Sequence, residues 1–245
     1  MKKILIILIL ILSVFSVANA HPFKSEKELY DYYAEIDKKI FTEKNKPIIR
    51  KKYPRKLTDK ELEQEQIPFS LKRYTVDEIV GNNKLVYNAF NYQLMSISQI
   101  NENNKEEGVI RTFDEDENLI SIAYIENSKG VMGIYREYYP WGVLKNETPY
   151  YTSEINGKLK NYYPDGLLKE EYTYYNNKKE GLATMYYESG QKFAIENYKN
   201  DLKNGDYYMY YENGTLGMKA FFVNGKRKGT IEFYEEDGKK IEKNK

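Results

Sequence analysis

The stretch GDYYMYYENG, residues 205–214, decides the fold, because the chain returns to its pattern at a constant interval. The same spacing between two glycines recurs upstream as GLATMYYESG (181–190), GKLKNYYPDG (157–166) and GIYREYYPWG (133–142). Neighbouring copies begin 24 residues apart, without insertion. Repetition at a fixed interval indicates a repeat architecture, in which each unit packs against the next one.

Several columns of the repeat keep this register. The glycines of the expected tight turns are Gly142, Gly166, Gly190, Gly214 and Gly238. The first aromatic column consists of Tyr138, Tyr162, Tyr186 and Tyr210, and the second of Tyr150, Tyr174, Tyr198 and Phe222. We expect equivalent aromatic residues to stack beside one another in neighbouring repeats. Because tyrosine offers a large rigid area and a hydroxyl group, both columns are candidate contacts for a partner.

Short runs rich in Tyr, Phe, Ile, Val and Thr alternate with two turn signals. One signal is the glycine after the paired tyrosines, and the other is a polar pair such as Asn200-Asp201. Such runs between such turns are typical of β-hairpins, and no apolar stripe at helical spacing crosses the repeat. The sequence therefore predicts an all-β fold, an elongated antiparallel meander of tandem β-hairpins with an N-terminal helical segment.

Which side chains lie on the apolar face depends on the type of the tight turn. Glycine at the third loop position favours a three-residue loop with a bulge, which places Tyr210, Leu216, Met218 and Phe222 on one face. A two-residue turn at Asn213-Gly214 would instead move Tyr210 to the face opposite Phe222. A change of register by one residue exchanges every side chain between faces.

The chain divides into four parts. Residues 1–20 carry a basic start, an apolar run and small residues at Ala18 and Ala20, which predicts a signal peptide cleaved after Ala20. The alternative is a membrane anchor, for which the apolar run is short. Residues 21–83 are expected to form an N-terminal helix and a charged linker, 84–132 degenerate repeats, and 133–245 the clear repeats. We therefore expect an exported protein, located in the periplasm, on the cell surface or outside the cell.

The helix is expected at residues 25–42. Its apolar side chains fall on one face at helical spacing, namely Leu29, Tyr32, Tyr33, Ile36 and Ile40. Ser25 and Glu28 have the spacing of a capping box. We expect this face to cover part of the sheet.

The repertoire of catalytic residues is poor. The chain has no cysteine and a single histidine, His21, which excludes disulfides, Cys–His pairs and zinc sites built from these ligands. Acidic residues such as Glu188 and Glu212 lie in turns, where solubility explains them. We therefore expect no enzyme activity, no cofactor and no metal site. The net charge of +1 argues against nucleic acid as a partner.

Two charged segments are candidate binding sites. The acidic run Asp114 to Glu117 lacks the ligand spacing of a calcium loop and is interpreted as a charged turn. The basic run could contact anionic lipid or glycan, although a solvated linker is the simpler interpretation. Its members are Lys46, Arg50, Lys51, Lys52, Arg55 and Lys56.

The motif G-x4-Y-Y-x-x-G, followed by a polar turn, resembles the bacterial variant of the MORN repeat (membrane occupation and recognition nexus). The resemblance covers residues 133–241 well and 84–132 weakly. It implies an elongated antiparallel sheet that serves as an interaction or assembly platform. The leading hypothesis is thus an exported scaffold that mediates protein–protein interaction at the cell envelope or outside the cell. Its partner would be another surface protein, a second copy of itself or a host component. The alternatives are a peripheral lipid- or glycan-binding module and an antitoxin-like protein that binds a partner protein.

Overall fold

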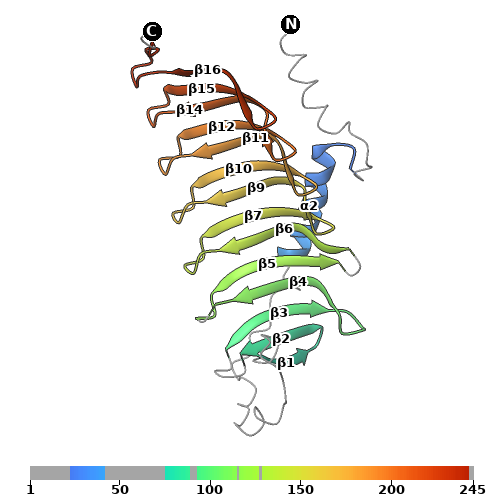
Figure 1. Cartoon of the computed structure of the whole chain (residues 1–245). Helices are drawn as coiled ribbons and strands as arrows, with labels where there is room; N and C mark the ends of the chain where they lie inside the picture. The colour runs from blue at the N-terminus through green and yellow to red at the C-terminus, as the bar shows by residue number, and fades with distance from the viewer. Residues whose placement is uncertain (1–22, 42–74, 89–92, 115, 127–128, 243–245) are drawn as a thin grey trace, which may run out of the picture.

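The computed structural model of the chain describes residues 23–41, 75–88, 93–114, 116–126 and 129–242. These residues form one helix and a 16-stranded antiparallel sheet, in which the strands follow one another like rungs (Figure 1). Each long strand pairs with its neighbours in sequence, and the short β8 and β13 pair with β7 and β12. The prediction of an all-β meander with an N-terminal helix is confirmed.

The elements have the following bounds: α2 Glu26–Phe41, β1 Thr75–Val80, β2 Asn83–Asn88, β3 Leu94–Ile100, β4 Glu106–Phe113, β5 Leu119–Glu126, β6 Gly130–Tyr138, β7 Leu144–Tyr151, β8 Glu154–Ile155, β9 Gly157–Tyr162, β10 Leu168–Tyr175, β11 Lys178–Tyr186, β12 Lys192–Lys199, β13 Leu202–Lys203, β14 Gly205–Tyr210, β15 Leu216–Val223 and β16 Lys226–Phe233. The sheet thus begins at β1, inside the range 21–83 that was expected to precede the repeats. The signal peptide and the basic run at 46–56 lie outside the described residues.

The turn after the paired tyrosines is a three-residue loop. Gly214 N–H donates to Tyr211 O at 2.9 Å, Tyr211 N–H donates to Thr215 O at 2.8 Å, and Gly214 has φ 85°. Glycine is favoured there because a β carbon makes a positive φ costly. The degenerate copy keeps the same turn with Glu117 at φ 61° in place of glycine.

The polar turn has both central residues at positive φ, as in Asn200 at 49° and Asp201 at 66°. This is the type I′ geometry that follows the twist of a hairpin. The turn also joins neighbouring repeats, because Asp201 N–H donates to Lys179 O at 3.1 Å and Lys179 N–H donates to Asp201 Oδ1 at 2.8 Å. Both turn signals of the repeat thus form hairpin turns, as predicted.

The predicted distribution of side chains over the two faces is wrong, although the loop behind it is confirmed. Tyr210 pairs with Leu216, but Met209 pairs with Met218, so Gly217 is an extra residue in β15. This bulge shifts the alternation by one position. Since paired residues share a face, Tyr210 lies opposite Met218 and Phe222 rather than beside them.

The same bulge recurs in the other clear repeats, at Lys145, Lys169 and Phe193. It places the two aromatic columns on opposite faces throughout the repeats. Equivalent residues of one column lie two strands apart, or about 9–10 Å. Among the described residues, each ring contact within the repeats joins residues of different columns or positions, such as Tyr172 and Tyr198. Equivalent tyrosines are therefore aligned in rows but do not stack on one another.

The second tyrosine of each pair ties its repeat to the next one. Its hydroxyl donates to the backbone carbonyl of the first tyrosine of the following pair, 23 residues further on. The four bonds run from Tyr139 to Tyr162 (3.0 Å), Tyr163 to Tyr186 (2.8 Å), Tyr187 to Tyr210 (2.8 Å) and Tyr211 to Tyr234 (2.9 Å). The paired tyrosines thus form a ladder of bonds along the sheet.

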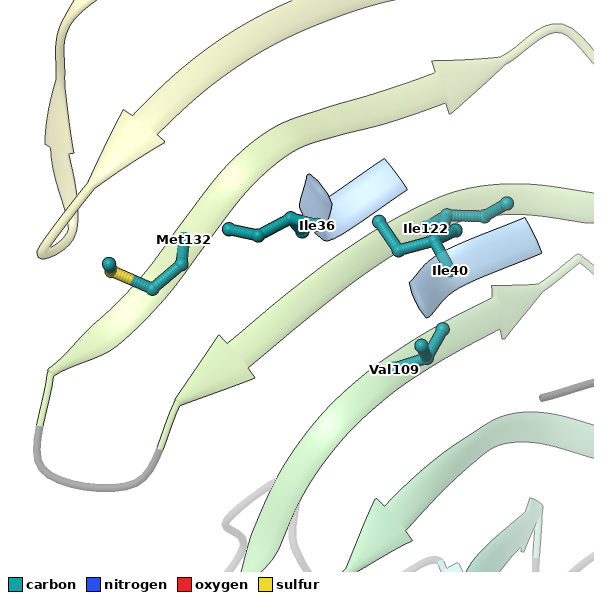
Figure 2. Packing of buried hydrophobic residues seen from close by; sticks show 5 residues of the cluster. All are labelled: Ile36, Ile40, Val109, Ile122 and Met132. Carbon is teal, nitrogen blue, oxygen red and sulfur yellow. The ribbon is translucent and has the colours of Figure 1, made fainter. Parts of the chain in front are cut away.

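Helix α2 packs across one face of the sheet, which we call the helix face. Glu28 N–H donates to Ser25 Oγ at 3.2 Å, which confirms the expected N-cap. The apolar side of the helix is buried, with Tyr33 1% and Ile40 0% exposed. The largest cluster joins this side to strands β4, β5 and β6 (Figure 2), and consists of Ile36, Ile40, Val109, Ile122 and Met132.

Polar contacts fix the position of the helix. Arg136 donates to both carboxylate oxygens of Asp37 at 2.8 and 2.7 Å, and to Glu147 at 3.2 Å. Arg111 donates to Ile40 O at 3.1 Å, which satisfies a carbonyl at the C-terminal end of α2. The expectation that the helix covers part of the sheet is confirmed. In the part of the chain that the structure describes, no helix has the length and apolar character that a membrane span requires.

Candidate interaction surface

The candidate aromatic residues divide between the two faces. The first column lies on the helix face, where Tyr138 packs against the α2 cluster and Tyr162 donates to Glu147 Oε2 at 2.8 Å. Tyr186 and Tyr210 lie on the same face beyond the helix. The second column lies on the opposite face. The eight predicted contacts therefore do not form one surface.

We call the face opposite α2 the tyrosine face. No helix among the described residues covers it. Besides the second column it carries a third set of aromatic residues, Tyr135, Tyr172 and Tyr207. The rings of the two sets meet edge to face, with centroids 6.1–6.4 Å apart in the pairs Tyr135–Tyr150, Tyr172–Tyr198 and Tyr207–Phe222.

Lysines and glutamates hold these rings in place. Lys179 Nζ lies 3.8 Å from the ring centre of Tyr172 and 5.1 Å from that of Tyr198, and Lys203 lies 4.8 Å from Tyr207. Such contacts attract a cation to the ring face. Lys203 Nζ also donates to Glu196 Oε1 at 2.5 Å, and the Tyr198 hydroxyl donates to the other oxygen of Glu196. Glu196 is buried, so its charge is satisfied within the protein.

On the same face, a chain of hydrogen bonds holds further side chains in place toward the N-terminal repeats. Thr148 donates to Asn146, Asn146 to Asn161, and Asn161 to Glu170, at 2.6, 2.6 and 2.7 Å. Tyr172 then donates to the second oxygen of Glu170 at 3.2 Å. These bonds cross strands β7, β9 and β10 and fix the side chains before any partner binds.

Burial raises the pKa of Tyr172 and Tyr198 above the ordinary tyrosine value, and the neighbouring carboxylates of Glu170 and Glu196 add to the effect. Both hydroxyls therefore stay protonated at neutral pH. They can donate hydrogen bonds but cannot serve as bases. This chemistry suits recognition rather than acid–base catalysis.

Sequence reasoning missed the third aromatic set and its glutamates, but a signal was present. Glutamate and tyrosine recur two residues apart in strands, as in Glu170-x-Tyr172 and Glu196-x-Tyr198. Because side chains alternate along a strand, such pairs lie on one face. The spacing thus predicts Tyr–Glu hydrogen bonds.

A cleft of about 430 Å³ lies between the C-terminal end of α2 and the first clear repeat. Phe41, Leu119, Tyr138 and Trp141 line it, and Phe41 and Trp141 are each more than half exposed. Its lining is apolar and aromatic apart from Asn118, so it offers contact area rather than catalytic chemistry.

The described residues of the acidic run, Asp114, Asp116 and Glu117, lie in a turn. Asp114 Oδ1 accepts from the backbone of Asp116 and Asn118 at 3.0 and 2.8 Å. Within the described residues, no group of three or more potential ligands is placed to hold a metal ion.

Comparison with known proteins concerns the repeat. A family model described as the MORN repeat variant matches three tandem segments, residues 155–177, 179–200 and 203–224. These segments span β8 to β15 and cover less than half of the chain. Repeats of this kind are generally protein- or lipid-binding modules. No curated protein matches the chain.

Among solved structures, one match is a crystal structure of a mutant of S. aureus TarM in complex with Fondaparinux, alpha-GlcNAc-glycerol and UDP. It is 11% identical, and the alignment covers 83% of this chain and 29% of that chain, with a TM-score of 0.18. This chain therefore spans less than a third of that protein. A likeness at this TM-score supports no conclusion about fold or function.

Proposed function

We propose that the protein is an interaction scaffold that binds a partner protein through the tyrosine face. The observation that carries this proposal is a row of half-buried aromatic rings, fixed by lysine and glutamate contacts, on a face without a covering helix in the described residues. Tyrosine is enriched at protein interfaces because one side chain supplies apolar area and a hydrogen-bonding hydroxyl.

The rings are already held in fixed positions before a partner binds, which supports this function. Ordering a side chain on binding costs roughly 0.5–1.5 kcal/mol. Tyr172 and Tyr198 are already held by ring contacts and hydrogen bonds, so less of this cost remains. Between the rings, the floor is formed by small buried residues such as Ala183 and Ala194, each 1% exposed. This floor is already covered, so a partner contacts the rings themselves.

Photo-crosslinking in the native cell tests the proposal. A photoreactive phenylalanine analogue replaces Tyr174 or Tyr198 on the tyrosine face, and in the matched control it replaces Glu212 in an exposed turn. Adducts with one protein at Tyr174 and Tyr198, but not at Glu212, are the expected result. Equal adducts at all three positions, or none on the tyrosine face, would contradict the proposal.

Lipid binding is the other outcome to distinguish. With the photoreactive analogue at Tyr150 on the same face, serine at Tyr172, Tyr174 and Tyr198 should abolish the adduct. Sedimentation with anionic vesicles that is unchanged by these substitutions and weakens with salt would assign binding to the basic run at 46–56 instead.

We further propose that the partner is encountered after export. The support is the order of basic, apolar and small residues in 1–20. Cell fractionation with mass analysis of the mature N-terminus tests this. A chain that begins at His21 outside the cytoplasm is expected, and an uncleaved cytoplasmic chain would contradict it.

A further inference from the structure

One glycine opens each repeat, and together these residues form what we call the glycine row: Gly133, Gly157, Gly181, Gly205 and Gly229. Helix α2 lies against the first two of them. A β carbon added at Gly133 would lie 2.6 Å from Ile36 Cγ2, and one at Gly157 would lie 3.1 Å from the Tyr30 hydroxyl. The helix can approach the sheet this closely only because these positions lack a side chain.

The spacing of the helix matches that of the repeats. Tyr30 and Ile36 are six residues apart, which is about 9 Å along a helix. Gly157 and Gly133 are two strands apart, which is about 9–10 Å across a sheet. A helix that crosses the strands therefore presents one contact residue to each repeat. Figure 1 shows α2 in this crosswise orientation beside the middle strands.

The polar contacts of α2 at Gly157 are made to backbone atoms. Lys158 N–H donates to the Tyr30 hydroxyl at 2.8 Å, and the Tyr33 hydroxyl donates to Asn156 O at 2.8 Å. These atoms belong to the residues just after and just before the glycine. One repeat further on, the atoms at the same positions in the repeat are Leu182 N and Glu180 O. There β11 runs unbroken through Gly181, whereas the strand is interrupted at Asn156, between β8 and β9.

Helix α2 begins at Glu26, one repeat short of Gly181. At Gly181 and Gly229 an added β carbon would meet nothing within 4 Å, and at Gly205 it would meet only the side chain of Asn197, at 3.1 Å. Leu182, next to Gly181, is 51% exposed, and Phe221 on the same face is 45% exposed. Over β11 to β16, no described helix covers this face.

We propose that the glycine row from Gly181 to Gly229 binds a second amphipathic helix, supplied by a partner polypeptide and of the same type as α2. Such a helix carries apolar residues and tyrosines at steps of three or four and six residues. The stretch is continuous with the α2 interface. It spans four strand spacings, or about 19 Å, which corresponds to about 13 helical residues. This site lies on the face opposite the tyrosine face and does not depend on it.

A synthetic peptide of residues 23–41, labelled with a fluorophore, is the probe for this site. The chain's own α2 is tethered at an effective concentration on the order of millimolar, so micromolar peptide does not displace it. Peptide that binds the full chain therefore reports the open part of the glycine row. A peptide with Tyr33→Asp and Ile36→Asp is the matched control.

Saturable binding of the α2 peptide, at least tenfold tighter than that of the control peptide, is expected in fluorescence anisotropy. Leu182→Asp should weaken binding at least tenfold, whereas Leu167→Asp, at a similarly exposed leucine in a turn, should not change it. Circular dichroism checks that both variants fold. Absence of saturable binding, or binding that Leu182→Asp leaves unchanged, would overturn the proposal. Tyr198→Ser should leave the peptide affinity unchanged, which separates this site from the tyrosine face.

Discussion

Replacement of Gly133 by alanine separates the contact between helix and sheet from the cost of an unusual backbone. Gly133 has φ 79° and Gly181 has φ 85°, so an alanine at either position costs about 1–2 kcal/mol from backbone conformation alone. Only at Gly133 does the new β carbon meet another group, 2.6 Å from Ile36 Cγ2 and 3.2 Å from Ile36 Cβ. Ile36 is 2% exposed and cannot move away freely. Overpacking of this kind costs about 1–3 kcal/mol more.

Urea denaturation measures both free energies of unfolding. We expect Gly133→Ala to lose about 2–5 kcal/mol in total and Gly181→Ala about 1–2 kcal/mol. Ile36→Ala alone should cost about 2–5 kcal/mol. In the double variant Gly133→Ala, Ile36→Ala, the loss should be about 1–3 kcal/mol smaller than the sum, because the clash is relieved. Equal losses at the two glycines together with full additivity would show that α2 does not pack on Gly133.

Three further predictions concern the ladder, the ion pair and the tyrosines. Tyr187→Phe removes one hydroxyl of the ladder and should lower the free energy of unfolding by about 0.5–1 kcal/mol; an unchanged urea midpoint would count against the ladder. Asp37→Asn removes the charge that pairs with Arg136 and should cost about 2 kcal/mol, whereas Asp31→Asn, in an exposed pair, should leave the melting temperature unchanged; equal effects would refute the importance of this half-buried pair. Burial raises the pKa of Tyr30 to about 12, so its contribution to stability is complete below pH 10 and is lost as the pH rises through 12. Denaturation at pH 8, 10 and 11.5 should show this loss, and a stability that is constant up to pH 11.5 would contradict it.

The repeat interval, the turns and the helix could be predicted because each depends on residue types. Glycine marks the positive φ of Gly214, and Asn200-Asp201 marks the type I′ turn. The apolar face of α2 follows from its spacing. These features are local, and local chemistry is what a sequence pattern records.

The distribution of side chains over the faces could not be predicted, because the bulge that controls it has no residue signature. The bulge positions are Lys145, Lys169, Phe193 and Gly217, which share neither size nor polarity. The bulge is a property of the strand pairing and not of any one side chain. For this reason the two aromatic columns appeared to be one candidate surface, and only pairing in three dimensions separates them.

The contacts of Trp141 could not be predicted from the sequence either. Its ring stacks on Tyr139 at 4.9 Å, and its Nε1–H donates to Pro164 O, one repeat further on, at 3.1 Å. A single tryptophan in the sequence carries no indication of this role. The contact depends on the repeat distance, which brings residues 23 positions apart together.

The central claim is that residues one repeat interval apart occupy equivalent places along one continuous sheet. The chain has no cysteine, so spin labels can be attached at single introduced cysteines without background. Asp165, Asn213 and Asp237 occupy equivalent exposed turns. Electron–electron resonance should give about 19 Å between labels at 165 and 213, and about 29 Å between labels at 165 and 237, apart from the reach of the labels themselves. Distances that do not increase from the first pair to the second would contradict the continuous sheet.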